Sequence, residues 1–112
     1  MMEAVWARST PISCIHPGWN PINGREQVLE SWQSILTGPA APAIRCRNAE
    51  ATIVGETGIV ICFEEIEGRF LIATNLFVLE DGGWRMVHHH AGPASAPPLG
   101  VEEETGKGEL LN

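Results

Sequence analysis

The sequence predicts an α+β fold, in which helices lie on one face of a curved antiparallel sheet. Two observations lead to this prediction. Helical periodicity is confined to the first third of the chain, and the strand-like segments that follow are joined by links of only two or three residues. Short links between successive strands are typical of an antiparallel meander, because a parallel pair needs a long crossover. Helices followed by a meander indicate an α+β arrangement.

Two helices are expected. Residues 1–7 favour a helix but span only about two turns, so we interpret them as the end of a longer N-terminal helix that is truncated in this chain. From Gly24 onward apolar residues recur at helical spacing, until a Gly-Pro pair at 38–39 ends the helix. A short strand, Pro11–Ile15, is expected between them and stops at the His-Pro-Gly breaker that follows.

Four longer strands are expected in the rest of the chain. They are Ala43–Val54, Gly58–Ile66, Arg69–Leu79 and Trp84–Ala91. The last link, Asp81-Gly82, is typical of a tight hairpin turn. The acidic tail that follows is rich in proline and glycine and can bury little apolar surface. We therefore expect a folded domain over residues 1–95 and disorder over residues 96–112.

The turns predict which residues share a face of the sheet. A two-residue loop at Asp81-Gly82 places Phe77 opposite Met86 and Asn75 opposite His88. One face then forms an apolar wall with polar groups at one end: Val60, Cys62, Glu64, Ala73, Asn75, Phe77, Leu79, Trp84, Met86, His88 and His90. The other face, which would carry His89, is also apolar. Because a solvated sheet face should not be apolar, the pattern predicts a homodimer through sheet packing.

The composition excludes several classes of protein. A formal net charge of −7 argues against a nucleic-acid partner. No apolar run approaches the roughly 20 residues that a membrane helix needs, and the N-terminus lacks the layout of a secretory signal. We therefore expect no membrane partner and a cytoplasmic location. Cys14, Cys46 and Cys62 have neither zinc-binding nor redox spacing and are interpreted as small buried side chains.

Several motifs together resemble a known family. They are Trp6, Cys14-Ile15-His16-Pro17-Gly18-Trp19, Gly24-Arg25-Glu26, Ser31-Trp32, Ala73-Thr74-Asn75-Leu76-Phe77 and Trp84-Arg85-Met86-Val87-His88-His89-His90-Ala91. The chain is similar to the SnoaL-like branch of the nuclear transport factor 2-like (ketosteroid isomerase-like, cystatin-like) superfamily from residue 1 to about residue 95.

The resemblance implies a cone-shaped barrel, in which helices pack on the concave face of the sheet and enclose a deep pocket. It also implies dimerisation through the outer face of the sheet. Members of the family include isomerases, polyketide cyclases, dehydratases, hydrolases and non-catalytic ligand-binding domains. The fold alone therefore determines no reaction.

Candidate catalytic residues lie on the last strand and its neighbour. His88 and His90 share one face of a strand, and imidazoles that titrate near neutrality can act as a general acid and base. Asn75, predicted to lie opposite His88, could orient that ring or stabilise an oxyanion. Further pocket residues are expected at the wall and the open end of the cone, with Glu64 as a second base if it points inward: His16, Trp19, Glu64, Phe77 and Met86.

Two other chemistries fit the sequence less well. The chain has no tyrosine, and its single aspartate, Asp81, lies in a turn, so a ketosteroid isomerase mechanism with an Asp base and Tyr donor is excluded. A metal centre from His16, Glu64, His88 and His90 lacks the downstream glutamate of the comparable cupin pattern. No metal ligand and no cofactor are assigned.

The sequence thus predicts a domain that binds a small apolar organic molecule. One hypothesis is acid/base isomerisation, cyclisation or dehydration of that molecule. The alternative is a non-catalytic ligand-binding or dimerisation module, in which the imidazoles only complete a polar pocket floor.

Overall fold

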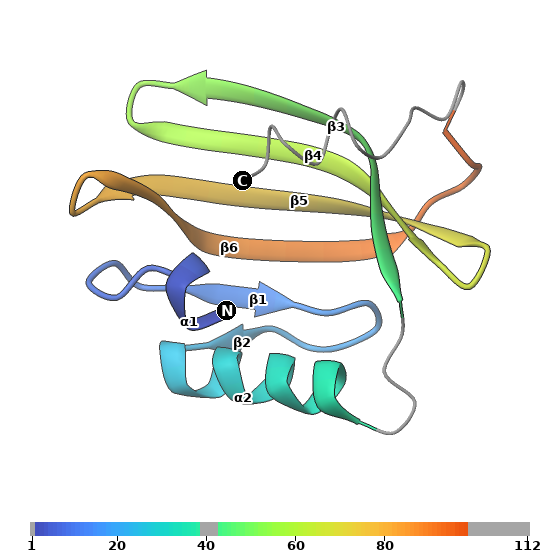
Figure 1. Ribbon diagram of the computed structural model, residues 1–112, viewed down its shortest axis with the longest axis horizontal. Helices are drawn as coiled ribbons and strands as arrows, with labels where there is room; N and C mark the ends of the chain where they lie inside the picture. The colour runs from blue at the N-terminus through green and yellow to red at the C-terminus, as the bar shows by residue number, and fades with distance from the viewer. Residues whose placement is uncertain (1, 39–42, 99–112) are drawn as a thin grey trace.

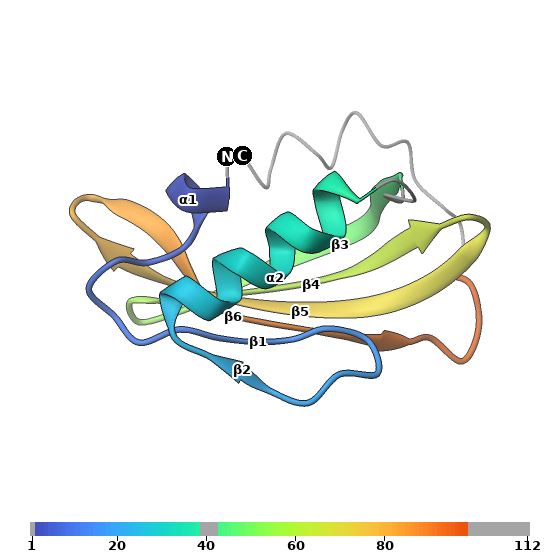
Figure 2. The ribbon, with the colours of Figure 1, turned by 90° about the horizontal axis from the view of Figure 1, so that it is seen from below.

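The fold consists of one curved sheet with both helices on its concave side (Figures 1 and 2). The computed structural model describes residues 2–38 and 43–98. The strands lie in the order β2-β1-β6-β5-β4-β3. The elements are α1 (Met2–Val5), β1 (Ser13–Ile15), β2 (Ile22–Asn23), α2 (Arg25–Thr37), β3 (Ile44–Val54), β4 (Thr57–Ile66), β5 (Arg69–Glu80) and β6 (Gly83–Pro93).

The predicted α+β class and the antiparallel meander from β3 to β6 are confirmed. The N-terminal part of the sheet differs from the prediction, because β1 pairs in parallel with β6. A parallel pair is compatible with the chain, since α2 and four strands separate β1 from β6 and supply the long connection. The β2 strand was not predicted, because its two residues are too few to show an alternating pattern.

The helix α2 presents a narrow buried face formed by Val28, Ser31 and Trp32. It begins after Gly24, whose φ of 91° suits a residue without a Cβ atom. Its first residue, Arg25, also holds the N-terminal segment in place. The guanidinium group donates hydrogen bonds to the carbonyl oxygens of Glu3 (2.7 Å), Trp6 (2.9 Å) and Ala7 (3.0 Å). These bonds satisfy carbonyl groups at the end of α1, a helix too short to be stable alone.

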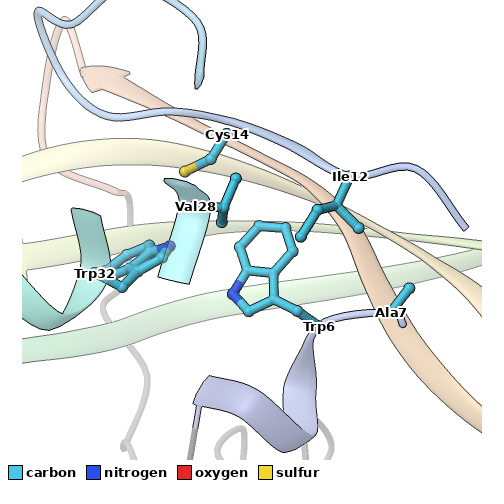
Figure 3. Close-up of a cluster of buried hydrophobic side chains, with 6 residues drawn as sticks. All are labelled: Trp6, Ala7, Ile12, Cys14, Val28 and Trp32. Carbon is cyan, nitrogen blue, oxygen red and sulfur yellow. The ribbon is translucent and has the colours of Figure 1, made fainter. Parts of the chain in front are cut away.

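Two clusters of buried side chains form the core. The first joins α1, β1 and α2 and is drawn in Figure 3: Trp6, Ala7, Ile12, Cys14, Val28 and Trp32. The second lines the concave face of the meander: Ala49, Val60, Cys62, Ala73 and Ala91. Because the members of the second cluster are small, they leave space between the sheet and the helices.

The register of the meander agrees with the prediction up to one point. Phe77 lies opposite Met86 and Val60 opposite Asn75, as expected. Between Leu76 and Phe77 the register shifts by one residue, so that Asn75 pairs with His89 and not with His88. The prediction for the histidines is therefore wrong. The extra residue of a β-bulge reverses the faces of all side chains beyond it.

The strand β6 continues two residues beyond its predicted end at Ala91. The next residue continues along β5, where the Ala94 amide donates a hydrogen bond to the Phe70 carbonyl oxygen (3.0 Å). Pro98 is buried. Residues 99–112, which make up most of the predicted tail, lie outside the described part of the chain.

Candidate active site

The bulge in β6 turns His89 into the concave side of the sheet. Only 4% of this residue is exposed. Its Nδ1 atom lies 2.5 Å from Asn75 Oδ1 on the neighbouring strand. Because an amide oxygen can only accept, Nδ1 carries the proton and Nε2 keeps its lone pair. His89 thus occupies the place beside Asn75 that the sequence predicted for His88.

The environment of His89 keeps its ring neutral. Desolvation by burial, with a smaller contribution from the neighbouring imidazole of His16, lowers the pKa of His89 to about 4. The Trp32 ring meets the imidazole edge-on, with ring centroids 5.2 Å apart. No hydrogen-bond partner for Nε2 occurs among the described residues. The side chain can therefore accept a hydrogen bond or a proton at this atom.

A second buried imidazole, His16, is part of a hydrogen-bonded chain. Ser31 Oγ donates to the Val28 carbonyl oxygen (2.7 Å) and lies 2.9 Å from His16 Nε2. The serine proton is used for the carbonyl group, so His16 Nε2 carries the proton and donates to Ser31. The Cys14 sulfur lies 3.9 Å from His16 Nδ1. Burial lowers the pKa of His16, so this ring is also neutral.

Aromatic rings enclose the two imidazoles. His16 contacts Trp19 and Trp32 edge-on, with centroid distances of 4.8 and 4.7 Å. The indole N–H groups of Trp6 and Trp32 are buried without an oxygen or nitrogen acceptor in the described part of the chain. In Figure 3 the nitrogen edges of these two indoles face each other. A buried donor without a partner is typical of an interior that receives an acceptor from water or from a ligand.

His88 and His90 lie on the outer face of the sheet and do not approach Asn75. They pair in register with Leu76 and Thr74. His88 Nδ1 lies 2.7 Å from Ser13 Oγ, and the two imidazole centroids are 6.3 Å apart. Burial and then the neighbouring His90 lower the pKa of His88. The structure therefore separates this pair from the predicted pocket, because the bulge reverses both side chains.

The other predicted pocket residues have different surroundings. Glu64 shares the concave face with Cys62, and burial raises the pKa of its carboxyl group. Met86 packs against the first core cluster. Trp19 is 48% exposed, and its ring contacts the buried His16. Among residues 2–38 and 43–98, no group of three or more His, Cys, Asp or Glu side chains is placed to hold a metal ion.

An open cavity of about 550 Å³ lies on the concave side, next to α1. Its lining combines the end of α1 with parts of β3–β6: Ala4, Val5, Ala51, Thr52, Ile53, Gly58, Ile59, Val60, Phe77, Trp84 and Arg85. Phe77 is thus the one predicted pocket residue that lines this cavity. Asn75 is two residues from Phe77 on the same strand face, a distance of about 7 Å. The polar pair of Asn75 and His89 therefore lies next to Phe77 on the same face of the sheet.

Sequence reasoning missed Ser31, Trp32 and His89. Ser31 and Trp32 lie about one helical turn after Val28 on the buried face of α2, which helical periodicity indicates. Their contact with His16 depends on how α2 crosses β1. No sequence signal marks the bulge that turns His89 inward.

The chain is similar to one protein family and to solved structures of the same fold. Residues 1–96 match the family profile described as a SnoaL-like domain. A candidate calcium/calmodulin-dependent protein kinase type II association domain from Thiobacillus denitrificans is 34% identical, with a TM-score of 0.72, over 85% of this chain and 80% of that chain. A candidate dehydratase of the NTF2-like family from Streptomyces avermitilis is 28% identical, also with a TM-score of 0.72, over 83% and 79% of the two chains.

A curated relative is longer than this chain. The F-box protein SKIP8 of Arabidopsis thaliana is 26% identical over 92 residues, which make up 80% of this chain and 40% of that protein. The chain thus spans less than half of the length of this relative. Among the described residues, no helix is long and apolar enough to cross a membrane.

Proposed function

Because the chain belongs to the SnoaL-like domain family, we propose that it binds a small apolar organic molecule in the cavity beside α1. The observation that carries this proposal is an apolar cavity beside α1, with Asn75 and the buried His89 on the adjoining part of the same sheet face. Its volume of about 550 Å³ lies in the range of small-molecule sites. Val5, Ile53 and Trp84 contribute apolar surface at the mouth, and Val60 and Phe77 close the inner wall.

A second proposal concerns what happens to the bound molecule. Asn75 holds His89 in the tautomer whose Nε2 accepts a proton, and the ring is neutral at pH 7. This arrangement supports general base chemistry such as proton removal next to a carbonyl group, the first step of many isomerisations, cyclisations and dehydrations. The role predicted for His88 and His90 thus passes to His89.

One experiment tests both proposals with 2-tetralone as the probe. Wild-type protein is expected to bind the ketone and to accelerate exchange of its α-hydrogens with deuterium, followed by NMR. Ala51→Trp, which fills the cavity, should weaken binding about tenfold or more, because the ligand loses its apolar contacts. His89→Phe should keep binding but lose the acceleration of exchange.

Matched controls separate the outcomes. Gln33→Trp adds the same side chain at an exposed position of α2, and His90→Phe removes an exposed imidazole. Both should behave like the wild type. Binding without any acceleration would refute the acid/base proposal and leave a ligand-binding module. Equal binding by wild type and Ala51→Trp would refute the cavity as the binding site.

We also propose that two copies of the domain pair through the outer face of the sheet. This face carries Ile61 and Ile72, which are 49% and 40% exposed. The half-buried Phe63 pairs with Ile72, and the half-buried Leu76 lies further along β5 on the same face. Exposed apolar patches of this kind are typical of interfaces. The association domain from Thiobacillus denitrificans, named for assembly, supports the same proposal.

Ile72→Glu is therefore expected to convert a dimer into a monomer, because the buried charge would lack a partner. Sedimentation equilibrium measures the mass directly. Val54→Glu is the matched control, since Val54 is 61% exposed at the β3–β4 hairpin, away from this patch. A wild-type protein that sediments as a monomer, or an Ile72→Glu variant that remains dimeric, would contradict the proposed interface.

We propose a cytoplasmic location on separate grounds. None of Cys14, Cys46 and Cys62 forms a disulfide in the described part of the chain. Cysteines outside disulfides are typical of a reducing compartment, whereas disulfides are common in secreted domains of this size.

A further inference from the structure

Two of the three cysteines meet on the concave face of the sheet, although they are 16 positions apart in the chain. Cys46 on β3 lies opposite Glu64 on β4, and a bulge between Arg47 and Glu50 follows at once. Cys46 packs against the second core cluster, of which Cys62 is a member. Their thiol groups are in hydrogen-bonding contact. The bulge of β3 therefore places a pair of thiols side by side.

The two thiols differ in access to solvent. Cys62 is 4% exposed, whereas Cys46 is half-buried. The hydrogen bond with Cys46, together with burial, raises the pKa of Cys62. The third cysteine, Cys14, is fully buried, and burial raises its pKa to about 11. Cys46 is thus the thiol that a reagent in solution reaches first, because a thiolate must be both formed and accessible.

We propose that Cys46 is a modification site for low-molecular-weight disulfides and that Cys62 resolves the adduct, which leaves a Cys46–Cys62 disulfide between β3 and β4. In the first step, the Cys46 thiolate attacks one sulfur atom of the reagent and expels the other as a thiolate. In the second step, the Cys62 thiolate attacks Cys46 Sγ and expels the second small thiolate. Two protein thiols are oxidised, and one small disulfide is reduced to two thiols.

The position of the pair gives the modification a structural consequence. Cys62 is two residues from Val60, which closes the inner wall of the cavity. Ala51, which pairs with Val60, lies on the same side of the bulge as the cavity. A covalent link across the bulge would hold the edge strand β3 against β4 at this point. This inference does not depend on the proposed ligand, because its readout is the covalent state of the two cysteines.

The test treats the reduced protein with oxidised glutathione and follows intact mass and alkylated peptides over time. Wild-type protein should lose the mass of two hydrogen atoms, with a cross-link between the peptides of Cys46 and Cys62. Cys62→Ser should instead accumulate one glutathione on Cys46. Cys46→Ser should react at least about tenfold more slowly, because the remaining thiols are buried.

Cys14→Ala is the matched control and should give the same cross-link as the wild type. Cys46→Ala repeats the Cys46 test if the serine variant does not fold, as judged by circular dichroism. A wild-type protein that keeps a stable glutathione adduct would overturn the resolving role of Cys62. Equal rates for wild type and the Cys46 variants would overturn Cys46 as the site of attack.

Discussion

Replacing Trp6 with alanine is expected to lower the free energy of unfolding by about 3–5 kcal/mol, the usual cost of removing a buried tryptophan side chain. Trp6 is 1% exposed and lies at the centre of the cluster that joins α1, β1 and α2. The helix α1 has four residues and none of them is buried, so it depends on this contact and on Arg25. The loss would be a large part of the stability of a small domain.

Urea denaturation followed by circular dichroism measures this effect. Trp19→Ala is the matched control, because Trp19 is exposed and should cost only about 1 kcal/mol or less. Trp6→Phe keeps most of the apolar contact, so its loss in the free energy of unfolding should lie between those of Trp6→Ala and Trp19→Ala. Similar losses for Trp6→Ala and Trp19→Ala would show that the first core cluster does not stabilise the fold.

The second large effect is a loss of stability in mild acid. Burial lowers the pKa of His89 from 6.5 to about 4 in the folded chain. Between these values the unfolded state binds more protons, so the free energy of unfolding falls as the pH falls. Above pH 6.5 the neutral His89 side chain contributes about 3 kcal/mol to the free energy of unfolding. This contribution is lost as the pH approaches 4.

Thermal or urea unfolding at a series of pH values tests this prediction through the difference between two variants. His89→Gln should show a flatter decline than the wild type between pH 6.5 and pH 4. His90→Gln, a change at an exposed ring of the same strand, should follow the wild type. Carboxyl groups such as Glu64 affect all of these curves alike. Parallel curves for wild type and His89→Gln would contradict a neutral, buried His89.

Local sequence signals determined much of the secondary structure. The apolar spacing after Gly24 predicted α2, and the Asp81-Gly82 turn predicted the last hairpin. Both turn residues have positive φ, 52° and 78°, as a tight two-residue hairpin turn requires. The position of this turn predicted that Phe77 pairs with Met86, and the structure confirms this pairing. These features depend on residues close together in the chain, which is why the sequence alone predicts them.

The tertiary structure determines which side chains form the candidate site. The bulge near Val87 exchanges the faces of His88, His89 and His90, and it arises where β6 must follow the curved sheet and also pair with β1. The contact of His16 with Ser31 likewise requires α2 to lie across β1. The family and the meander could be predicted because they are encoded in composition and spacing. Which imidazole faces the interior could not, because one inserted residue reverses a strand face and its energy depends on neighbours distant in the sequence.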